Sequence, residues 1–218
     1  MRIIEPFYEI LVMDDAQSIL QRIELAGRVC YKSEERITDD SAKNFVRRII
    51  ANGHHSVLEH ITATVRLVCD RGITHELVRH RVGVAYSQES SRFCNYSKGK
   101  FGSELTFIRP MFWDVPTVEY QLWQYAVKEA EYAYFTLLKN GARPEEARSV
   151  LPTSVKSEII ITANMREWRH IFSLRCAKAA HPQMRQVMLP LLQEMYTRVP
   201  VLFEDIANSL LPKGKRND

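Results

Sequence analysis

The segment RHRVGVAYSQESSR, residues 79–92, is the most unusual stretch of this 218-residue sequence. Two arginines flank a histidine, and short hydroxyl and amide side chains follow before a third arginine. Guanidinium groups suit bidentate contacts with phosphate, and neighbouring arginines repel one another unless an anion lies between them. A solvated basic helix end would explain the arginines alone, because cations suit the helix dipole. The added hydroxyl-rich turn favours a polyanionic ligand.

Glu76 lies three and four residues before Arg79 and His80, so the three side chains would share one face of a helix. A routine helix ion pair explains this spacing without any catalytic role. The spacing therefore predicts proximity of these groups and no more.

A second cluster, Asn52–His60, contains three histidines and a glutamate. It lacks the HExxH pattern of a helical zinc site, and the adjacent His54 and His55 cannot readily share one metal on a helix. We therefore expect no metal. Two interpretations stay open: a helix start whose N–H groups receive a phosphate, or a turn held by hydrogen bonds from Glu59 and His60.

A third cluster runs from Asn164 to Arg175. Arg166 and His170 are four residues apart and would share a helix face. Arg148 is an isolated cation upstream. Each is typical of a surface charge by itself, but arginines next to polar helix starts are together typical of a nucleotide-phosphate site.

Hydrophobic periodicity predicts strands and helices that do not alternate as βαβ units. We expect an α/β chain of the mixed α+β kind with a helical C-terminal half. Strands are expected at residues 3–12, 61–69, 105–108 and 158–162. Helices are expected at 15–29, 41–52, 75–81 with Thr74 as cap, 116–139, 144–150, 165–175 with a capping box from Asn164 and Glu167, 182–197 and 200–210. Residues 213–218 are expected to be an exposed tail.

Composition indicates one soluble globular domain over residues 1–218, with 45% hydrophobic and 26% charged residues. The net charge of +4 suits a phosphate-bearing ligand as well as nucleic acid. The four cysteines form no CxxC pair, which argues against a zinc site or a disulfide framework. Glu5, Pro6 and Glu9 interrupt the first apolar stretch, and no run approaches the roughly 20 apolar residues of a membrane helix. We expect a cytoplasmic enzyme.

Four segments together resemble one enzyme family. Residues 79–90 are similar to the signature of the flavin-dependent thymidylate synthases (the ThyX family), which is RHR, seven or eight residues, and then Ser. Gly53–His60 resembles the family's G-H-x-[ST]-x-x-E-H stretch. Ala147–Pro152 and Asn164–Arg175 resemble two further segments in the same order. The resemblance covers roughly residues 25–200, and four ordered segments are far more specific than RHR alone.

This resemblance implies a ThyX-type fold with a central sheet and a homotetramer whose active sites are shared between subunits. It implies reductive methylation of dUMP to dTMP, a step of dTMP biosynthesis. Methylenetetrahydrofolate would supply the carbon, FAD would carry the hydride and NADPH would be the reductant. The protein itself would orient the reacting rings and stabilise charge.

The resemblance also implies a set of site residues. Arg175 would be catalytic, beside the uracil ring, where a guanidinium stabilises negative charge developing on N3 and the carbonyl oxygens. FAD contacts are expected at Ser56, Arg79, His80, Arg81, Gln88, Asn164, Met165, Arg166 and His170. Contacts to dUMP are expected at Glu76, Leu77, Val78, Arg79, Gln88, Glu89, Ser90, Ser91, Arg92, Arg148 and Arg175.

The sequence departs from the commonest family pattern at several positions. The spacer after RHR has eight residues. Gln88 stands where Glu is frequent, Phe93 where Tyr is usual, Glu76 where some members have Gln, and His170 where we expect Asn. A carboxylate repels a phosphate, so Glu76 is expected nearer the sugar or the base. The resemblance does not determine the exact contacts at these positions.

Other mechanisms and functions fit less well. Ser90 has arginines rather than a base beside it, which argues against a serine nucleophile. Classical thymidylate synthases use a cysteine after a proline, and none of the four cysteines follows one. A nucleic-acid-binding module would explain RHR, but no known nucleic-acid motif frames the scattered arginines. A histidine-rich metallohydrolase would need three convergent ligands.

Overall fold

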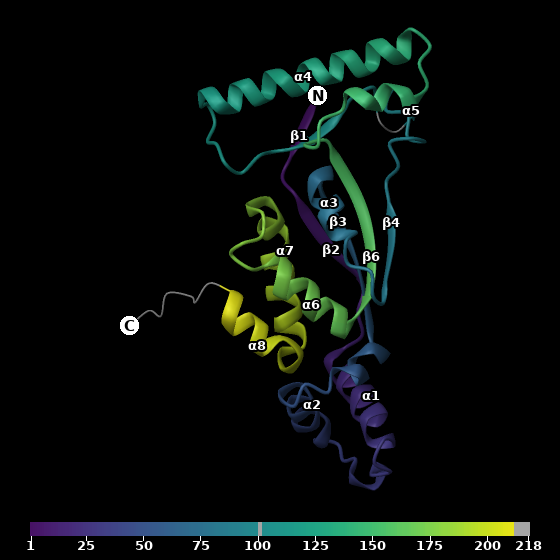
Figure 1. The fold of residues 1–218 in the computed structure, drawn as a ribbon, viewed down its shortest axis with the longest axis vertical. Helices are drawn as coiled ribbons and strands as arrows, with labels where there is room; N and C mark the ends of the chain where they lie inside the picture. Colours follow the sequence, from purple (N-terminus) through teal and green to yellow (C-terminus); the bar gives the residue numbers. More distant parts are fainter. Residues whose placement is uncertain (100–101, 212–218) are drawn as a thin grey trace. The chain divides into compact units, whose positions relative to one another are not determined.

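The computed structural model describes residues 1–99 and 102–211 (Figure 1). The tail expected at 213–218 lies outside these residues. The described chain divides into two compact units. Unit 1 comprises residues 1–7, 67–79 and 87–160, and unit 2 comprises residues 8–66, 80–86 and those from 161 onward.

A four-stranded sheet has the order β2-β3-β6-β4, and β1 pairs with β5 in a small parallel sheet. The strands are β1 (Arg2–Ile4), β2 (Phe7–Val12), β3 (Thr62–Asp70), β4 (Val84–Gln88), β5 (Thr106–Ile108) and β6 (Lys156–Asn164). The amide of Asn164 donates to the carbonyl of Gly83, and the amide of Glu89 donates to that of Glu158. As one partner's number rises the other falls, so β4 and β6 are antiparallel.

The helices are mostly where periodicity predicts them. They are α1 (Ala16–Val29), α2 (Ser41–Ala51), α3 (Arg71–Leu77), α4 (Val118–Lys139), α5 (Pro144–Ala147), α6 (Met165–Arg175), α7 (Pro182–Arg198) and α8 (Pro200–Leu210), with short 3-10 helices η1 (Glu34–Arg36), η2 (His55–His60) and η4 (Arg148–Val150). No helix among the described residues combines the length and apolarity that crossing a membrane requires.

The core of unit 1 forms where α4 packs against neighbouring strand and loop residues. Val127 and Tyr134 of α4 are buried together with Leu105, Phe107 and Val155. Val127 and Tyr134 are seven residues apart, which is the spacing of one helix face. The helix begins at Thr117, whose side chain accepts from the amide of Tyr120, and ends before Gly141 at φ +91°.

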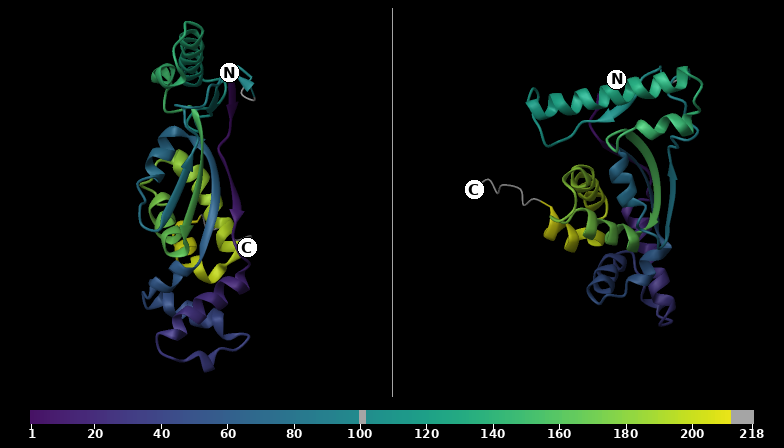
Figure 2. Two further views of the ribbon diagram at one scale, coloured as in Figure 1. Left: turned by 90° about the vertical axis from the view of Figure 1, so that its right-hand side faces the viewer. Right: turned by 45° about the horizontal axis from the view of Figure 1, so that its top comes forward.

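Unit 2 is built around α6, α7 and α8, which lie side by side in both views of Figure 2. Trp168 stacks on Phe172, and Phe172 contacts Phe203 of α8 edge to face. The indole N–H of Trp168 donates to the carbonyl of Ala63 at 3.1 Å, which ties α6 to β3. Aromatic pairs in such a buried cluster stabilise the fold by more than the burial of their apolar surface area alone.

Alternation along β3 follows the expected pattern, with Ala63, Val65 and Leu67 buried and Thr62 exposed. Both β3 and β6 contribute residues to unit 1 and to unit 2. One domain over residues 1–218 stays a prediction.

The helix expected at 75–81 with Thr74 as its cap is wrong in position. Asp70 is the N-cap, because its side chain accepts from the amide of Ile73 at 2.9 Å, and α3 already ends at Leu77. The RHR segment therefore lies in the connection between α3 and β4, not at a helix end. Asp70 is both the last residue of β3 and the N-cap of α3. The sequence pattern placed it next to a strand and gave no separate sign that a helix begins there.

Two other expectations need correction, and one strand was not expected at all. The strand expected at 3–12 is two strands, because Glu5-Pro6 interrupts it and Pro lacks the N–H that a ladder needs. The helix expected at 144–150 is α5 followed by η4. β4 was not expected, because Tyr86-Ser87-Gln88 is too polar to predict a strand and pairing with β6 decides its conformation.

Candidate functional site

The expected site residues divide between the two units. Unit 2 holds most of the residues expected to contact FAD, and unit 1 holds most of those expected to contact dUMP. Unit 2 contains Ser56, His80, Arg81, Asn164, Met165, Arg166, His170 and Arg175; unit 1 contains Glu76, Leu77, Val78, Arg79, Gln88, Glu89, Ser90, Ser91, Arg92 and Arg148.

A cavity of about 520 Å³ in unit 2 gathers several of these residues. Asn164, Arg166 and His170, all at or near the start of α6, line it together with His55 and Glu59 of η2. Ser56 lies between His55 and Glu59 on η2, and its side chain is exposed. The volume falls in the range of ordinary small-molecule sites.

The start of α6 is positioned by the segment that follows RHR. The side-chain oxygen of Asn164 accepts from the amide of Glu167 at 2.9 Å and caps the helix. The amide of Asn164 donates to Gly83, and that of Met165 donates to Ile61. Met165 is fully buried, so its side chain belongs to the core and only its backbone could face a ligand. The expected cap is confirmed, although Glu167 directs its carboxylate elsewhere.

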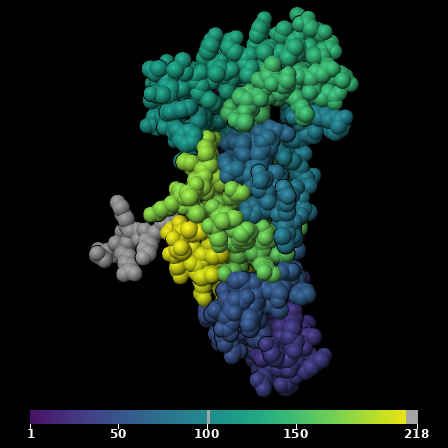
Figure 3. Space-filling view, viewed as in Figure 1, coloured from purple at the N-terminus to yellow at the C-terminus, as the bar shows by residue number. Residues whose placement is uncertain are grey.

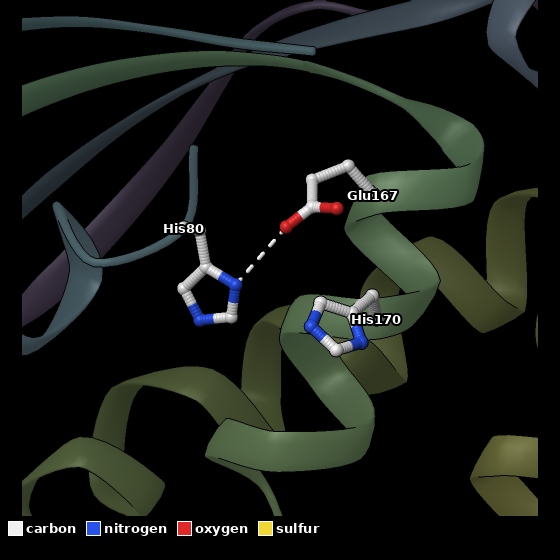
Figure 4. A group of neighbouring side chains, drawn as sticks. All are labelled: His80, Glu167 and His170. Atoms are coloured by element: carbon white, nitrogen blue, oxygen red, sulfur yellow. Dashed lines mark hydrogen bonds and ion pairs between the residues drawn. The ribbon is translucent and has the colours of Figure 1, made fainter. Parts of the chain in front are cut away.

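That carboxylate contacts His80, the central residue of RHR (Figure 4). The Nδ1 atom of His80 lies 3.0 Å from Oε1 of Glu167, and Nε of Arg175 lies 3.0 Å from the Nε2 atom of His80. The hydroxyl of Tyr86 donates to the His80 carbonyl at 2.9 Å. His80 is 5% exposed. His80, Glu167, Arg175 and Tyr86 thus form one network, in which His80 and Glu167 are buried and Arg175 and Tyr86 are partly buried.

The protons of this network follow from chemistry. A guanidinium can only donate, so Nε2 of His80 accepts and Nδ1 carries the hydrogen that is donated to Glu167. Burial lowers the pKa of His80 to about 4, and the charges of Arg175 and His170 act in the same direction. Burial raises the pKa of Glu167, opposed by His170 and Arg166. His80 is therefore a neutral imidazole at pH 7.

His80, Glu167 and His170 also resemble a set of metal ligands, since their ligand atoms lie within 4.8 Å of one another (Figure 4). The network argues against this use. Metal bound at Nδ1 of His80 would move the proton to Nε2, where it would face the N–H of Arg175. A dication would also lie close to a permanent positive charge. The expectation that the chain binds no metal stays a prediction.

The arginines of the third cluster have different roles. Arg166 pairs with Glu59 at 2.6 Å on the exposed rim of the cavity. Arg169 is buried and bonds both carboxylate oxygens of Asp205 as well as the carbonyl of Leu202, so it joins α6 to α8. Arg166 is therefore placed to meet an anion at the cavity, whereas Arg169 is structural.

Three further expected arginines remain available as charges. Arg79, Arg81 and Arg148 are exposed, and no ion pair within residues 1–99 and 102–211 engages them. The lining of the cavity in unit 2 carries no positive excess, because the carboxylates of Glu59, Glu167 and Asp205 outnumber its two arginines.

In unit 1, Gln88 and Glu89 line a second cavity of about 830 Å³. The side-chain nitrogen of Gln88 donates to the hydroxyls of Thr74 at 2.8 Å and Ser157 at 2.9 Å, which leaves its carbonyl oxygen as the group that could meet a ligand. The amide orientation thus makes Gln88 an acceptor toward the cavity.

The carboxylate of Glu89 is already satisfied within unit 1. It accepts from the hydroxyl of Tyr96 at 2.7 Å and pairs with Lys156 at 2.5 Å. Burial and the Glu89 charge raise the pKa of Tyr96, which keeps that phenol a donor. An expected contact of the Glu89 side chain with an anionic nucleotide would compete with Lys156, so its backbone is the better-placed group.

The remaining motif residues form a tight turn. The carbonyl of Ser90 accepts from the amide of Cys94 at 2.9 Å, and its hydroxyl accepts from the amide of Arg92 at 3.3 Å. Arg92 pairs with Glu145 at 2.9 Å. Ser91 and Leu77 are buried, so their side chains face the interior and not a ligand. Ser90 has no base within this turn, in agreement with the argument against a nucleophile.

Sequence reasoning missed Glu167 and Tyr86 as parts of the site. Glu167 was interpreted only as a capping residue. Its spacing of three residues from His170 placed both on one face of α6, which was the available signal. The contact with His80 spans 87 positions of sequence and could not be read from any local pattern.

Comparison with known proteins identifies the family of this chain. Residues 11–201 match the family model described as thymidylate synthase complementing protein. A flavin-dependent thymidylate synthase from Pyrococcus abyssi is 36% identical over 186 residues, covering 82% of this chain and 75% of the relative. The same enzyme from Geobacter sulfurreducens is 32% identical over 190 residues, covering 84% and 80%. The one from Corynebacterium diphtheriae is 31% identical over 210 residues, covering 88% and 81%.

A solved structure confirms the fold. The UMP/dUMP methylase PolB from Streptomyces cacaoi, bound with 5-Br dUMP, superposes with a TM-score of 0.76 over 96% of this chain and 98% of that one. At 22% identity this likeness concerns the fold alone. The family match, by contrast, spans most of the chain and includes all four motifs. The chain therefore belongs to the family of thymidylate synthase complementing proteins, the flavin-dependent thymidylate synthases.

Proposed function

We propose that this chain is a flavin-dependent thymidylate synthase that methylates dUMP to dTMP, with methylenetetrahydrofolate as carbon donor and NADPH as reductant. One observation carries the proposal beyond family membership. Asn164, Arg166 and His170 line a single cavity of unit 2, and the same helix carries Arg175 in a buried network with His80.

The residues of this cavity fit a flavin. His55 and His170 provide flat ring edges, Asn164 provides an amide, and Arg166 provides a cation at the rim. The first turn of α6 adds the positive end of a helix dipole. FAD, when bound, supplies the redox chemistry of hydride transfer, and the chain supplies binding, orientation and electrostatics.

Arg175 is the residue that we assign to the pyrimidine. Its guanidinium keeps its charge at every physiological pH and is a planar donor that matches a uracil edge. It would stabilise negative charge that develops on N3 and the adjacent carbonyl oxygens as the ring becomes nucleophilic. If the guanidinium of Arg175 is fixed in place before the reaction, it need not reorient as charge develops on the pyrimidine. The orientation of this guanidinium therefore affects the rate.

The dUMP phosphate is assigned to exposed arginines of unit 1. Arg79 and Arg148 lie at exposed positions and have no ion-pair partner in the part of the chain that the structure describes. A phosphate bound between cations would relieve their unpaired charge. Glu76, on α3, is assigned to the sugar or base, since its carboxylate would repel the phosphate.

We also propose a homotetramer with active sites shared between subunits. The side chains of Val118, Leu122, Tyr125 and Tyr132 are each between 64% and 69% exposed along one face of α4. The surface of this helix is seen in teal in Figure 3. Apolar side chains grouped on one helix face, with the exposed Glu129 among them, mark an interaction surface. We propose that a second copy of α4 packs against this face. A cytoplasmic location fits the proposed soluble substrates.

The first test is the visible absorption spectrum of the purified protein with and without dUMP. A flavin band that shifts on addition of dUMP, together with dTMP formation from dUMP, methylenetetrahydrofolate and NADPH, is the expected result. A colourless protein that takes up no FAD and forms no dTMP would overturn the proposal.

Variants refine this test. Arg175→Ala should abolish dTMP formation while FAD is retained, because its assigned contact is with the pyrimidine. Arg148→Ala should raise the KM for dUMP. Arg36→Ala, at an exposed arginine of η1 that pairs with its neighbour Glu35, is the matched control and should change neither dTMP formation nor the KM for dUMP.

A further inference from the structure

His80 lies between two residues of α6 in a continuous chain of hydrogen bonds. Arg175 approaches its Nε2 atom and Glu167 its Nδ1 atom, each at 3.0 Å. Figure 4 shows the imidazole edge turned toward the carboxylate, with His170 beside it. The rings of His80 and His170 meet edge to face at 5.5 Å between centroids. His80 is thus held on both nitrogens, and its ring cannot turn without losing a bond.

The hydrogen bonds at the His80 ring donate in one direction, from Arg175 through His80 to Glu167. The Arg175 Nε–H donates to the imidazole, and the imidazole Nδ1–H donates to Glu167. A carboxylate that accepts from one ring nitrogen fixes the tautomer and leaves a lone pair on the other. The bond from Arg175 engages Nε and not the terminal nitrogens of the guanidinium. The His80 ring therefore holds the guanidinium at its Nε edge.

We propose that His80 and Glu167 are positioning residues for Arg175, and that Glu167 acts through the imidazole by fixing its tautomer. This inference rests on the proposed function, in which Arg175 stabilises charge on the pyrimidine. His80 then belongs to the orientation of the catalytic guanidinium as well as to the FAD contacts that RHR implies. Loss of the carboxylate would let the imidazole turn or change tautomer, and Arg175 would lose the Nε2 atom of His80 as an acceptor.

The charged and titratable groups facing His80 agree with this role. They are Glu167, His170 and Arg175 of α6 and the hydroxyl of Tyr86 on β4. Arg175 and His170 disfavour a second proton on the ring, and burial does so more strongly. A protonated His80 would direct an N–H at the donor of Arg175, so the network exists only while the imidazole is neutral.

The kinetic test uses three variants. In Glu167→Ala the acceptor is lost, and kcat per bound flavin should fall roughly 100-fold, the usual cost of about 1 Å of misplacement. The KM for dUMP and the flavin content should change little. Glu167→Gln retains an oxygen acceptor of the same size and should recover much of the lost rate. His80→Gln, which removes the ring, should behave like Glu167→Ala.

Glu24→Gln is the matched control. Glu24 is a buried carboxylate of α1 in unit 2 that pairs with Arg28 at 2.7 Å, far in sequence from every assigned site residue. Its substitution should lower stability without lowering kcat per bound flavin. If Glu167→Ala also changed only stability or flavin content, and kcat per bound flavin stayed at the wild-type value, the positioning role would be overturned.

A second measurement does not depend on activity. Nitrogen NMR of histidine-labelled protein, with His80 assigned from the His80→Gln spectrum, reports which ring nitrogen carries the proton. Hydrogen on Nδ1 alone at pH 7, with loss of this preference in Glu167→Ala, is expected. Hydrogen on Nε2 in the wild-type protein would overturn the inference. A wild-type protein that formed no dTMP would instead refute the proposed function, and the NMR result would still decide the tautomer.

Discussion

Gly83→Ala is expected to destabilise this protein by about 2 kcal/mol, because two separate costs meet at that position. Gly83 has φ +65°, a left-handed conformation that costs other residues about 1 kcal/mol or more. A Cβ built there would lie 2.3 Å from the Nδ2 atom of Asn164. Asn164 must then move, and its cap on α6 is worth about 1 kcal/mol.

Gly53→Ala separates the two costs. Gly53 has φ +71°, and a Cβ there would meet no heavy atom within 4 Å, so only the backbone cost of about 1 kcal/mol should appear. The free energy of unfolding, measured by urea titration at constant m value, should fall about twice as far in Gly83→Ala as in Gly53→Ala. Equal losses in the two variants would refute the close approach of Gly83 to Asn164.

A double-mutant cycle tests the same contact directly. In an Asn164→Ala background the Nδ2 atom is absent, so adding Gly83→Ala should cost only the backbone part, about 1 kcal/mol. Additive losses would contradict the argument. Because α6 begins at this contact and carries Glu167 and Arg175, Gly83→Ala should also lower kcat per bound flavin.

Three further predictions concern the titration of His80, the Arg169–Asp205 pair and the exposed face of α4. The folded-state pKa of His80, about 4 against an ordinary 6.5, means that mainly the unfolded state binds a proton between these values. Stability should therefore fall as pH drops from about 6.5 to about 4, by at most about 3 kcal/mol, and thermal melts of His80→Gln should show a flatter pH dependence. Asp205→Asn leaves buried Arg169 without its charge partner and should cost about 1–2 kcal/mol in urea, whereas Glu204→Gln, at the exposed pair with Arg47, should cost little. Leu122→Glu on the apolar face of α4 should dissociate the proposed tetramer, and unchanged mass in light scattering would contradict that interface.

Local patterns determine much of the secondary structure. Ile19 and Ile23 lie four residues apart and are fully buried, because α1 has one apolar stripe and Asp15 to begin it. Asn164 was recognised as a cap from its spacing to Glu167, since capping is a contact over three residues. An apolar helix face and an N-cap both depend on residues three or four positions apart, so the local sequence pattern predicts them.

The conformation of β4 and the start of α3 were not predictable in the same way. Val84–Gln88 forms a strand only because the edge of β6 accepts it, and its own residues are too polar to indicate that. Asp70 closes an apolar strand and opens a helix at the same time. In both places a partner distant in sequence, or a neighbouring element, decides between alternatives that the local pattern leaves open.

The sequence by itself determined the family, the order of its four signature segments and most of the helices, because these are recorded in residue type and short spacing. Only the tertiary structure decided that His80 hydrogen-bonds to both Glu167 and Arg175. It also decided that Arg169 is buried and pairs with Asp205, and that Met165 belongs to the core. These roles depend on which groups meet across long separations in sequence. A hydrogen bond needs two atoms about 3 Å apart, and folding alone determines which atoms those are.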